Sequence, residues 1–439
     1  MQAQRKSAFI GLSHLGLVTS TVWASLNHEV IGIDENKKVI DSLKANKPLI
    51  MEDDIVLQEP GLPELFKKIH KRYYPTTNFS EISNAQLVFF SKDTPKDVFN
   101  PENIIKCLIK KATPHFSQDV TIVIMSQVPI GFCREIKNYI KKTRPNLSFS
   151  LYHWVDTIIM TNAIDRFLHP ERIILGMDDK DEILPKFFEK EIKNFKCPVF
   201  KMSFESAELT KAAINLYLAN SVTFANTLSD FCEAVGANIN EIIPALRTDA
   251  RIGPSAYIRP NLRIAGGHLE RDLLMLEKLA KRKKISSGSV GFIIKQNNLR
   301  YKWAIKKINI HLKKKNPKIC IWGLSYKKNT TSTKNAASLE ILKALKNKAC
   351  LSAYDPMAIM PKNINGYKRF EEKYEALKGS DCLLVLTEWN EFKKVSSKRL
   401  KELLKNRLII DSAGVINLEI EELKDFNYIS MGFSNNSIN

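Results

Sequence analysis

The chain has 439 residues, of which 44% are hydrophobic and 26% are charged, and its formal net charge is +20. Such a length predicts two or three domains, and such a composition is typical of a globular protein with an ample core. The chain contains no apolar run of about 18 residues, so a membrane span is not expected, and its N-terminus lacks the apolar segment of a signal peptide.

The seven cysteines are scattered along the chain and form no CxxC pair. They therefore predict neither a disulfide framework nor a metal centre, and they fit a reducing cytoplasm. The positive charge has two interpretations: attraction of polyanions or phosphorylated small molecules, or simply an abundance of lysine on solvated helix ends. Because the basic residues are dispersed and no nucleic-acid-binding motif is present, nucleic acid is not an expected partner.

The first part of the chain alternates short apolar stretches with helical ones. The expected strands are 8–12, 28–34, 85–91 and 120–126, and the expected helices end near residue 26 and span about 101–112 and 132–142. Strands that alternate with helices predict a parallel sheet with helices on both faces.

The turn GLSHLG follows the first strand, and an acid, Asp34, ends the second. Gly11 permits a tight turn and Gly16 a close approach of helix and strand, while Ser13 stands where a dinucleotide-binding turn has its middle glycine. Asp34 is suited to accept from a ribose diol and to repel a 2′-phosphate, which favours NAD over NADP. The alternative is an ordinary turn between a strand and a helix.

A long helix is predicted from Ser206 to about Val235, because this stretch contains neither Pro nor Gly and ends before Gly236. Glu208, Lys211 and Asn215 fall on one face of it. They form either a solvated stripe or a polar group that faces a cleft, where Lys and Asn stabilise a developing alkoxide. Further helices are expected at about 269–282 and 289–315.

A second alternating unit begins near residue 317. Its expected strands are KICIWGL (318–324), ACLSAYD (349–355), DCLLVLTE (381–388) and RLIIDS (407–412). The predicted fold is therefore α/β, with two Rossmann-like doubly wound domains joined by a long central helix and a helical region. The expected domain boundaries are 1–200, 201–305 and 306–439.

Two further segments contain candidate catalytic residues. Asp156 lies in the otherwise apolar stretch YHWVDTIIM and is either a base in a cleft or a capped structural acid. The segment AGGHLERD (265–272) follows a basic loop, and its glycines allow backbone to approach a ligand closely.

A series of short stretches runs along nearly the whole chain. They are GLSHLG with VIGID, QEPGLPELF (58–66), DTP (93–95), SQVPIG (126–131), HPERIILG (169–176), SAELTKAAINLYLAN (206–220), DARIG (249–253), GLSYKKNT (323–330), AYDP (353–356) and TEWNEF (387–392). In their order and residue identities, these stretches resemble the UDP-glucose/GDP-mannose dehydrogenase family of nucleotide-sugar dehydrogenases. The stretches most specific to this family are EPGL, AELTKAAIN and TEWNEF.

The resemblance implies an NAD-binding N-terminal domain, a helical spine through which two subunits form a homodimer, and a C-terminal domain that binds a UDP-sugar. Typical members oxidise the sugar 6-hydroxyl twice with two NAD, and a cysteine thiolate holds the aldehyde between the two steps. Lys211 and Asn215 match the helix residues that polarise the substrate oxygen. Arg251 matches the arginine that reaches the neighbouring subunit's substrate, and Arg259 and Lys327 are expected substrate contacts. The expected cofactor contacts are Gly11, Ser13, Gly16, Asp34, Thr94, Gln127 and Lys334.

Departures from the family cluster where its catalytic residues should lie. The family's NPEFLREG reads WVDTIIMT here, so that Asp156 replaces one glutamate and Met160 the other. Gln127, Lys334 and Ala413 replace a threonine and two arginines. In RPNLRIAGGHLERD (259–272), Asp272 meets the family's aspartate, but His268 meets the cysteine, or Leu269 does if the glycines are aligned.

The resulting expectation is NAD-dependent oxidation of a UDP-glucose or UDP-N-acetylhexosamine type of nucleotide sugar for surface-polysaccharide synthesis. The expected catalytic residues are Asp156, Lys211, Asn215, His268 and Asp272, with a non-standard second step because no thiol is present. Two-electron and four-electron oxidation both remain open. The alternatives are a catalytically impaired nucleotide-sugar-binding scaffold and a β-hydroxyacid dehydrogenase-like enzyme, although the second alternating unit argues against the latter.

Overall fold

The computed structural model describes residues 6–52, 55–94, 100–265 and 268–434, and all structural statements refer to these residues. Residues 1–5, on which the expectation for the N-terminus rests, lie outside them, as do Pro95 of the DTP stretch and the glycine pair 266–267. The chain divides into two compact units, Met1–Ala213 and Ile214–Asn439, which are described separately.

The N-terminal unit alternates strands and helices, as its sequence pattern predicts. Its strands are β1 (Lys6–Ile10), β2 (Glu29–Ile33), β3 (Ile50–Glu52), β4 (Ile55–Leu57), β5 (Tyr73–Thr76), β6 (Ala85–Phe90), β7 (Val120–Ile124), β8 (Phe149–Trp154), β9 (Ile173–Met177) and β10 (Val199–Ser203). Its helices are α1 (His14–Ser25), α2 (Lys37–Lys44), α3 (Leu62–Ile69), α4 (Asn103–Ala112), α5 (Phe132–Thr143), α6 (Ala163–Leu168) and α7 (Lys186–Lys193).

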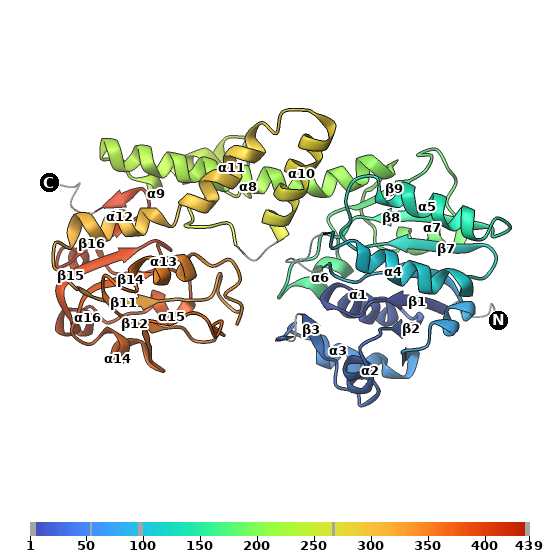
Figure 1. The fold of residues 1–439 in the computed structure, drawn as a ribbon, viewed down its shortest axis with the longest axis horizontal. Coiled ribbons are helices and arrows are strands. Elements are labelled where there is room, and N and C mark those ends of the chain that lie inside the picture. Colours follow the sequence, from blue (N-terminus) through green and yellow to red (C-terminus); the bar gives the residue numbers. More distant parts are fainter. Residues whose placement is uncertain (1–5, 53–54, 95–99, 266–267, 435–439) are drawn as a thin grey trace. The chain divides into compact units, whose positions relative to one another are not determined.

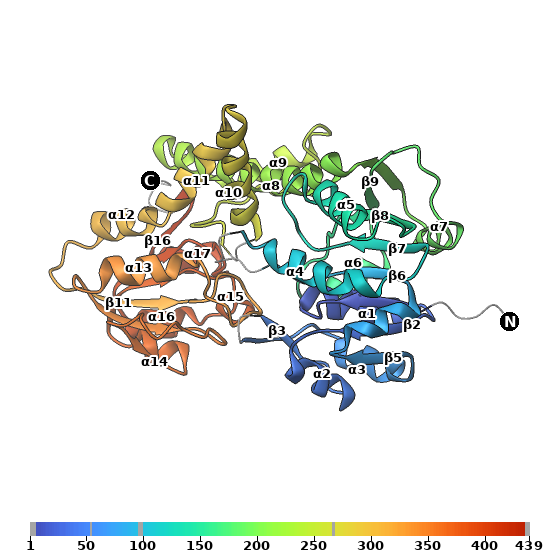
Figure 2. The ribbon, with the colours of Figure 1, turned by 45° about the vertical axis from the view of Figure 1, so that its right-hand side comes forward.

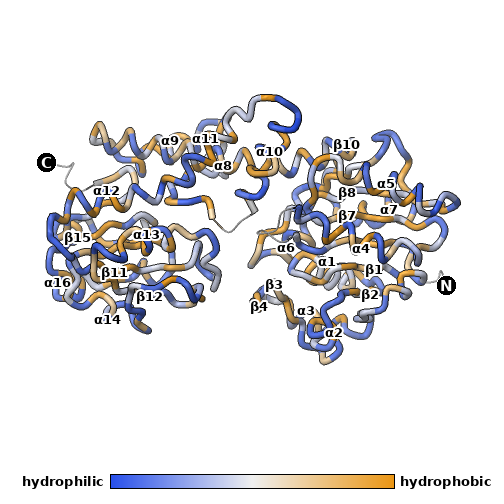
Figure 3. The backbone as a smooth tube through the Cα atoms, viewed as in Figure 1, coloured by the Kyte–Doolittle hydropathy of each residue, from blue (hydrophilic) through white to orange (hydrophobic). Residues whose placement is uncertain are grey.

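The described strands form one sheet in the order β10-β9-β8-β7-β6-β1-β2-β5, with β3 and β4 as a separate hairpin. Neighbours in the large sheet are parallel except β8 and β9. The central strands are buried along almost their whole length, because α1, α2, α3, α6 and α7 cover one face and α4 and α5 the other (Figures 1 and 2). These strands are accordingly among the most hydrophobic segments of the chain (Figure 3).

The sheet order changes direction at β1, which lies between β2 and β6. In an open α/β sheet, ligands bind at such a switch point, beyond the carboxyl ends of the strands. The turn after β1 and the loop after β6 therefore lie where a cofactor is expected to bind.

Helix α8 (Phe204–Val235) is a single helix of 32 residues that begins in the N-terminal unit and ends in the C-terminal one (Figure 1). The prediction of a long uninterrupted helix is thus confirmed. It follows from the absence of helix-breaking residues between Ser206 and Val235.

The C-terminal unit contains a helical part and a second sheet. Its helices are α9 (Ile239–Thr248), α10 (His268–Lys283), α11 (Ser289–Leu299), α12 (Lys302–His311), α13 (Ala337–Leu345), α14 (Lys373–Leu377), α15 (Asn390–Lys393), α16 (Ser397–Leu403) and α17 (Ile420–Leu423). Its strands are β11 (Lys318–Trp322), β12 (Cys350–Tyr354), β13 (Lys368–Arg369), β14 (Ser380–Val385), β15 (Leu404–Asp411), β16 (Asn427–Ser430) and β17 (Phe433–Ser434).

This second sheet has the order β13-β12-β11-β14-β15-β16-β17 and is parallel except at β17. Helices α12 and α13 pack on one face and α14, α15 and α16 on the other. Two α/β units joined by one long helix confirm the predicted fold class.

One predicted helix, over about 289–315, is wrong in extent. The structure divides it into α11 and α12 at Arg300 and Tyr301, and α12 ends at His311. At the break, the amide of Trp303 donates to the carbonyl oxygen of Arg300, and the Arg300 guanidinium pairs with Asp230 on α8. A contact with another helix accompanies this break, and no local helix-breaking residue marks it in the sequence.

Candidate functional site

The turn after β1 has the close packing that a dinucleotide-binding turn requires. Gly11 has φ +91°, and a Cβ on it would lie 2.4 Å from the Cβ of Lys92. A Cβ on Gly16 would lie 1.8 Å from the carbonyl oxygen of Gly11. Glycine is therefore needed at both positions, for the turn at the first and for helix packing at the second. This geometry fits a dinucleotide at the turn.

Asp34 lies directly beyond β2, with its side chain almost fully buried. Its Oδ2 accepts from the amide of Leu12 at 2.6 Å, and its Oδ1 accepts from the amide of Asn36 at 2.8 Å. The ammonium of Lys92 also donates to Oδ2, at 2.9 Å. The acid expected to meet a ribose therefore faces the turn but is already paired with a cation.

Ser13, which replaces the middle glycine, precedes α1, but its side chain accepts no capping hydrogen bond from that helix. Its Oγ accepts instead from the amide of Asp93, at 2.7 Å. The carboxylate of Asp93 in turn accepts from the amide of Leu15 in the first turn of α1, at 2.9 Å. Neither Lys92 nor Asp93 was an expected site residue, although two charged residues directly after the apolar stretch VFFS are a usable signal.

Thr94 and Gln127 follow the neighbouring strands β6 and β7. The hydroxyl of Thr94 lies 3.4 Å from the carbonyl oxygen of Gln127. The structure thus places these two expected cofactor residues together, at the same edge of the sheet as the turn. Lys334 lies in the other unit, between β11 and α13, where its amide donates to the hydroxyl of Ser332.

A buried pair formed by His14 and Glu59 borders the turn. The Nε2 of His14 lies 2.8 Å from the Oε2 of Glu59, which also accepts from the amide of Thr161. Burial opposes charge on the imidazole, but the hydrogen bond to Glu59 and the charges of Glu59, Asp93 and Asp156 outweigh it and raise the pKa of His14. The sequence motif EPGL contains Glu59 but does not reveal its partner.

Lys211 on α8 meets Asp156 within the N-terminal unit. Its ammonium donates to the carbonyl oxygen of Asp156 at 2.5 Å and lies 3.9 Å from the carboxylate. Burial raises the pKa of Asp156, and the charge of Asp93 adds to this effect, while Lys211 and the amide of Ile158 oppose it. A carboxyl group with a raised pKa beside an ammonium is suited to exchange protons with a ligand.

Asn215 on α8 meets Asp272 on α10 within the C-terminal unit. The Nδ2 of Asn215 donates to the Oδ2 of Asp272 at 2.5 Å, and both side chains are buried. The Nε of Arg271 lies 4.0 Å from the other carboxylate oxygen. His268 is the first residue of α10, one turn before Asp272, but its side chain lies outside the described part of the chain.

The expected substrate residues occupy different settings in the C-terminal unit. Arg259 donates to the carboxylate of Glu388 and to the carbonyl oxygen of Ala413, both at 2.6 Å, and so joins its loop to the ends of β14 and β15. Arg251 is exposed and pairs with Asp249. Lys327 lies in the loop after β11, over the ring of Tyr326.

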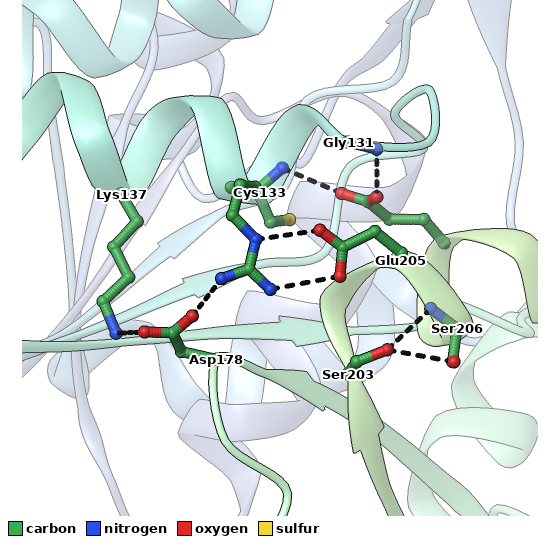
Figure 4. Close-up of polar contacts among 9 residues, drawn as sticks. Gly131, Cys133, Lys137, Asp178, Ser203, Glu205 and Ser206 are labelled. Atoms are coloured by element: carbon green, nitrogen blue, oxygen red, sulfur yellow. Dashed lines mark hydrogen bonds and ion pairs between the residues drawn. The ribbon is translucent and has the colours of Figure 1, made fainter.

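Glu208 contacts different partners from Lys211 and Asn215. Its carboxylate is buried and accepts from the amides of Gly131 and Cys133 at 2.5 and 2.8 Å, which caps the N-terminus of α5 (Figure 4). Burial, with the charge of Glu208, holds the pKa of the Cys133 thiol well above its usual value. A thiol held in its neutral form in this way is a poor nucleophile.

Within the described ranges, no cluster of three or more His, Cys, Asp or Glu side chains is arranged to hold a metal ion. Over the same ranges, every helix is too short or too polar to cross a membrane.

Three family models match consecutive parts of the chain. They describe the NAD binding, central and UDP binding domains of the UDP-glucose/GDP-mannose dehydrogenase family and match residues 5–193, 205–298 and 320–418. The N-terminal unit thus contains an NAD-binding domain, which confirms the cofactor predicted from the turn and Asp34.

Full-length relatives agree with these matches. The chain is 28% identical to a UDP-glucose 6-dehydrogenase of Rickettsia bellii, over 97% of this chain and 98% of the relative. It is 27% identical to the UDP-glucose 6-dehydrogenase TuaD of Bacillus subtilis, over 98% and 93%.

Solved structures share the fold at lower identity. A UDP-glucose dehydrogenase of Pyrobaculum islandicum superposes with a TM-score of 0.83 at 18% identity, over 99% of both chains. A UDP-D-ManNAc dehydrogenase of Pyrococcus horikoshii gives a TM-score of 0.83 at 19% identity, over 97% of this chain and 99% of the other.

Proposed function

Because the chain belongs to the UDP-glucose/GDP-mannose dehydrogenase family of NAD-dependent oxidoreductases, we propose that it oxidises UDP-glucose or a UDP-N-acetylhexosamine. The product serves the synthesis of a surface polysaccharide. The contact between Asn215 and Asp272 carries this proposal, because it joins a buried carboxylate to an amide on the long helix. A nucleotide-sugar dehydrogenase needs such a pair where hydride leaves an alcohol.

NAD, held at the turn after β1 near Asp34, would supply the acceptor for the hydride that leaves the sugar carbon in the first oxidation. The ammonium of Lys211 donates to the substrate oxygen and stabilises its developing negative charge. The amide of Asn215 fixes the carboxylate of Asp272, which orients the reacting group and accepts its proton through water. Asp156 takes the position of the family's glutamate and holds Lys211 through its backbone carbonyl.

The second oxidation differs from the usual scheme because His268 stands where the cysteine is expected. An imidazole is better suited to act as a base than as a nucleophile that holds an aldehyde covalently. We infer that the hydrated aldehyde, with Asp156 or His268 as its base, replaces the thiohemiacetal as the species that gives up the second hydride. The hydrate loses one hydride to NAD and one proton to the base, which leaves a carboxylic acid.

The test is the amount of NADH formed per sugar consumed, with the product mass, over a panel of UDP-, GDP- and dTDP-sugars. About two NADH per sugar indicates a uronate and about one indicates an aldehyde or ketone, since each NADH carries two electrons. If the unaltered chain stops at about one NADH because only the thiol is lacking, the His268→Cys variant shifts the yield towards two. The matched variant Asp272→Asn should lose both steps while still binding the nucleotide.

Two outcomes contradict parts of this proposal. If the unaltered chain gives about one NADH and His268→Cys leaves that yield unchanged, the replacements Gln127 and Met160 matter as well, or the oxidised group is not a 6-hydroxyl. If no nucleotide sugar is turned over, the protein is a nucleotide-sugar-binding scaffold.

We also propose that the chain forms a homodimer through a helical domain at residues 201–305, between an NAD-binding domain at 1–200 and a UDP-sugar-binding domain at 306–439. Tyr217, Phe224 and Phe231 follow one another at seven-residue intervals on α8 and are 63, 49 and 65% exposed. Large apolar side chains in such a row are typical of a helix that packs on a partner. In this dimer, Arg251 reaches the substrate of the neighbouring subunit, whereas Arg259 and Lys327 contact their own.

A further inference from the structure

We propose that Lys92 and Asp93 are an internal substitute for the adenosine diphosphate half of the cofactor, which NAD must displace to bind. The inference rests on the NAD-dependent function proposed above. Both residues lie in the loop after β6, beside the turn after β1, at the switch point of the sheet. They meet the two polar groups of this turn that a dinucleotide uses.

Lys92 occupies the ribose side of the turn. Asp34 is the acid placed to accept from the ribose hydroxyls, but its Oδ2 already accepts from the amide of Leu12 and from the ammonium of Lys92, at 2.6 and 2.9 Å. A ribose diol must therefore compete with an ammonium, and a bond between two charged groups is stronger than a bond from a neutral hydroxyl to the same carboxylate. While Lys92 donates to Asp34, a further hydrogen bond from a 2′-hydroxyl adds little to the binding of the nucleotide.

Asp93 occupies the pyrophosphate side. The first amides of a helix attract an anion, because their N–H groups lack partners within the helix and point towards its N-terminus. The amide of Leu15 in α1 already donates to the carboxylate of Asp93, at 2.9 Å. Ser13 holds this arrangement, since its hydroxyl accepts from the amide of Asp93 at 2.7 Å.

The C-terminal unit shows that a turn of this kind does not need a cation on its acid. Its turn after β11 has the same three residues, Gly-Leu-Ser, with Gly323 at φ +93° against +91° for Gly11. The acid after β12, Asp355, accepts from the amide of Leu324 at 2.7 Å, as Asp34 does from Leu12. The ring N–H of Trp389 and the hydroxyl of Ser325 supply its other side-chain donors, with no cation.

The position of Lys92 is also matched by a neutral residue in the C-terminal unit. A Cβ on Gly11 would meet Lys92, and a Cβ on Gly323 would meet Thr387. Thr387 donates its hydroxyl to the carbonyl oxygen of Ser325, a neutral contact between the same two loops. The cation after β6 is therefore particular to the N-terminal turn, whereas Glu388, which follows Thr387 as Asp93 follows Lys92, is an acid that pairs with Arg259.

Binding of NAD then carries two separable costs. The pyrophosphate must replace the Asp93 carboxylate or lie beside it with like charge, and the ribose must replace the Lys92 ammonium. Removing one charge relieves one cost and leaves the other. The two side chains can therefore be tested with two different probes.

The experiment measures dissociation constants of NAD, ADP and 2′-deoxy-ADP by calorimetry for the full chain and two variants, Asp93→Asn and Lys92→Met. Asp93→Asn should tighten NAD and both ADP probes by about tenfold, because it removes the competing anion. Lys92→Met should favour ADP over 2′-deoxy-ADP by about fivefold or more, whereas the unaltered chain should bind the two about equally, because Lys92 satisfies Asp34. The matched controls Asp119→Asn and Lys106→Met remove a surface charge of the same unit and should change nothing.

The possible results distinguish failure of this inference from failure of the proposed function. Unchanged dissociation constants in both variants overturn the inference and leave the NAD-dependent function standing. Tighter NAD binding in the variants without turnover of any nucleotide sugar supports the inference and overturns the proposed function. If neither the unaltered chain nor the Lys92→Met/Asp93→Asn double variant binds NAD or ADP, both are wrong, since these charges are then not what opposes the dinucleotide.

Discussion

At the scale of single residues, His153 shows how burial sets a charge state beside the candidate site. It lies in β8, three residues before Asp156, and its Nδ1 lies 2.9 Å from the carbonyl oxygen of Ile124. Burial lowers the pKa of His153 to about 4, and the nearby Lys211 adds to this effect. The imidazole is therefore neutral at neutral pH and adds no further positive charge near Lys211.

This lowered pKa predicts an acid-sensitive N-terminal unit. The unfolded chain takes up a proton at His153 near pH 6.5, while the folded chain takes it up only near 4, so the contribution to stability is present above pH 6.5 and is lost as the pH falls towards 4. At pH 5 the loss is about 2 kcal/mol.

The measurement compares the unaltered chain with His153→Asn, which does not titrate but keeps an N–H donor for Ile124. Denaturant unfolding at pH 7.5 and pH 5 should show a smaller loss of unfolding free energy in the variant. Equal losses in the two proteins would mean that His153 is protonated in the folded state.

At the scale of elements, the start of α5 depends on a residue of another helix. Glu208 on α8 provides the carboxylate for the amides of Gly131 and Cys133, and Gly131 takes φ +95° to present its amide. One turn earlier, Glu205 pairs with Arg134 at the surface of the same region, next to Asp178 and Lys137 (Figure 4). The two glutamates thus join the same pair of helices in different surroundings.

We expect Glu208→Ala to lower the free energy of unfolding by about 2–4 kcal/mol, because it leaves two backbone donors at the end of α5 without their acceptor. Glu205→Ala removes a partly exposed ion pair and should cost about 1 kcal/mol or less. Urea denaturation followed by circular dichroism measures both. Similar losses in the two variants would show that capping by Glu208 contributes no more than a surface pair.

At the scale of the whole molecule, the exposed row on α8 makes a prediction about assembly. A glutamate at both Phe224 and Phe231 would place two charges in the proposed dimer interface, where burying an unpaired charge is unfavourable. The double variant should therefore have the mass of one chain at micromolar concentration by light scattering, while the unaltered protein has the mass of two.

The control for this prediction is Phe200→Glu, which changes an equally exposed phenylalanine on β10, away from α8. It should leave the dimer intact. A monomeric Phe200→Glu variant, or a dimeric Phe224→Glu/Phe231→Glu variant, would contradict an interface on the α8 row.

The sequence by itself determined those features that depend on neighbours along the chain. Buried strands appear as runs of apolar residues, α8 as a long stretch without Pro or Gly, and the cofactor turn as Gly11 and Gly16 with an acid after the next strand. Spacing along the long helix also indicated Lys211 and Asn215, and the resemblance to the family indicated Asp272; the structure places Asn215 against Asp272.

The partners of the polar groups that meet across the sheet depend on the folded chain. Lys92 reaches Asp34 from 58 positions away, and Asp93 reaches Leu15 from 78. Glu208, predicted with Lys211 and Asn215 as one polar group on α8, accepts from the amide of Gly131, 77 positions earlier. Such partners depend on the order of the strands and the path of the loops, which the periodicity of residues along the chain does not encode. The local motif therefore folds as expected, while distant residues determine the charges around it.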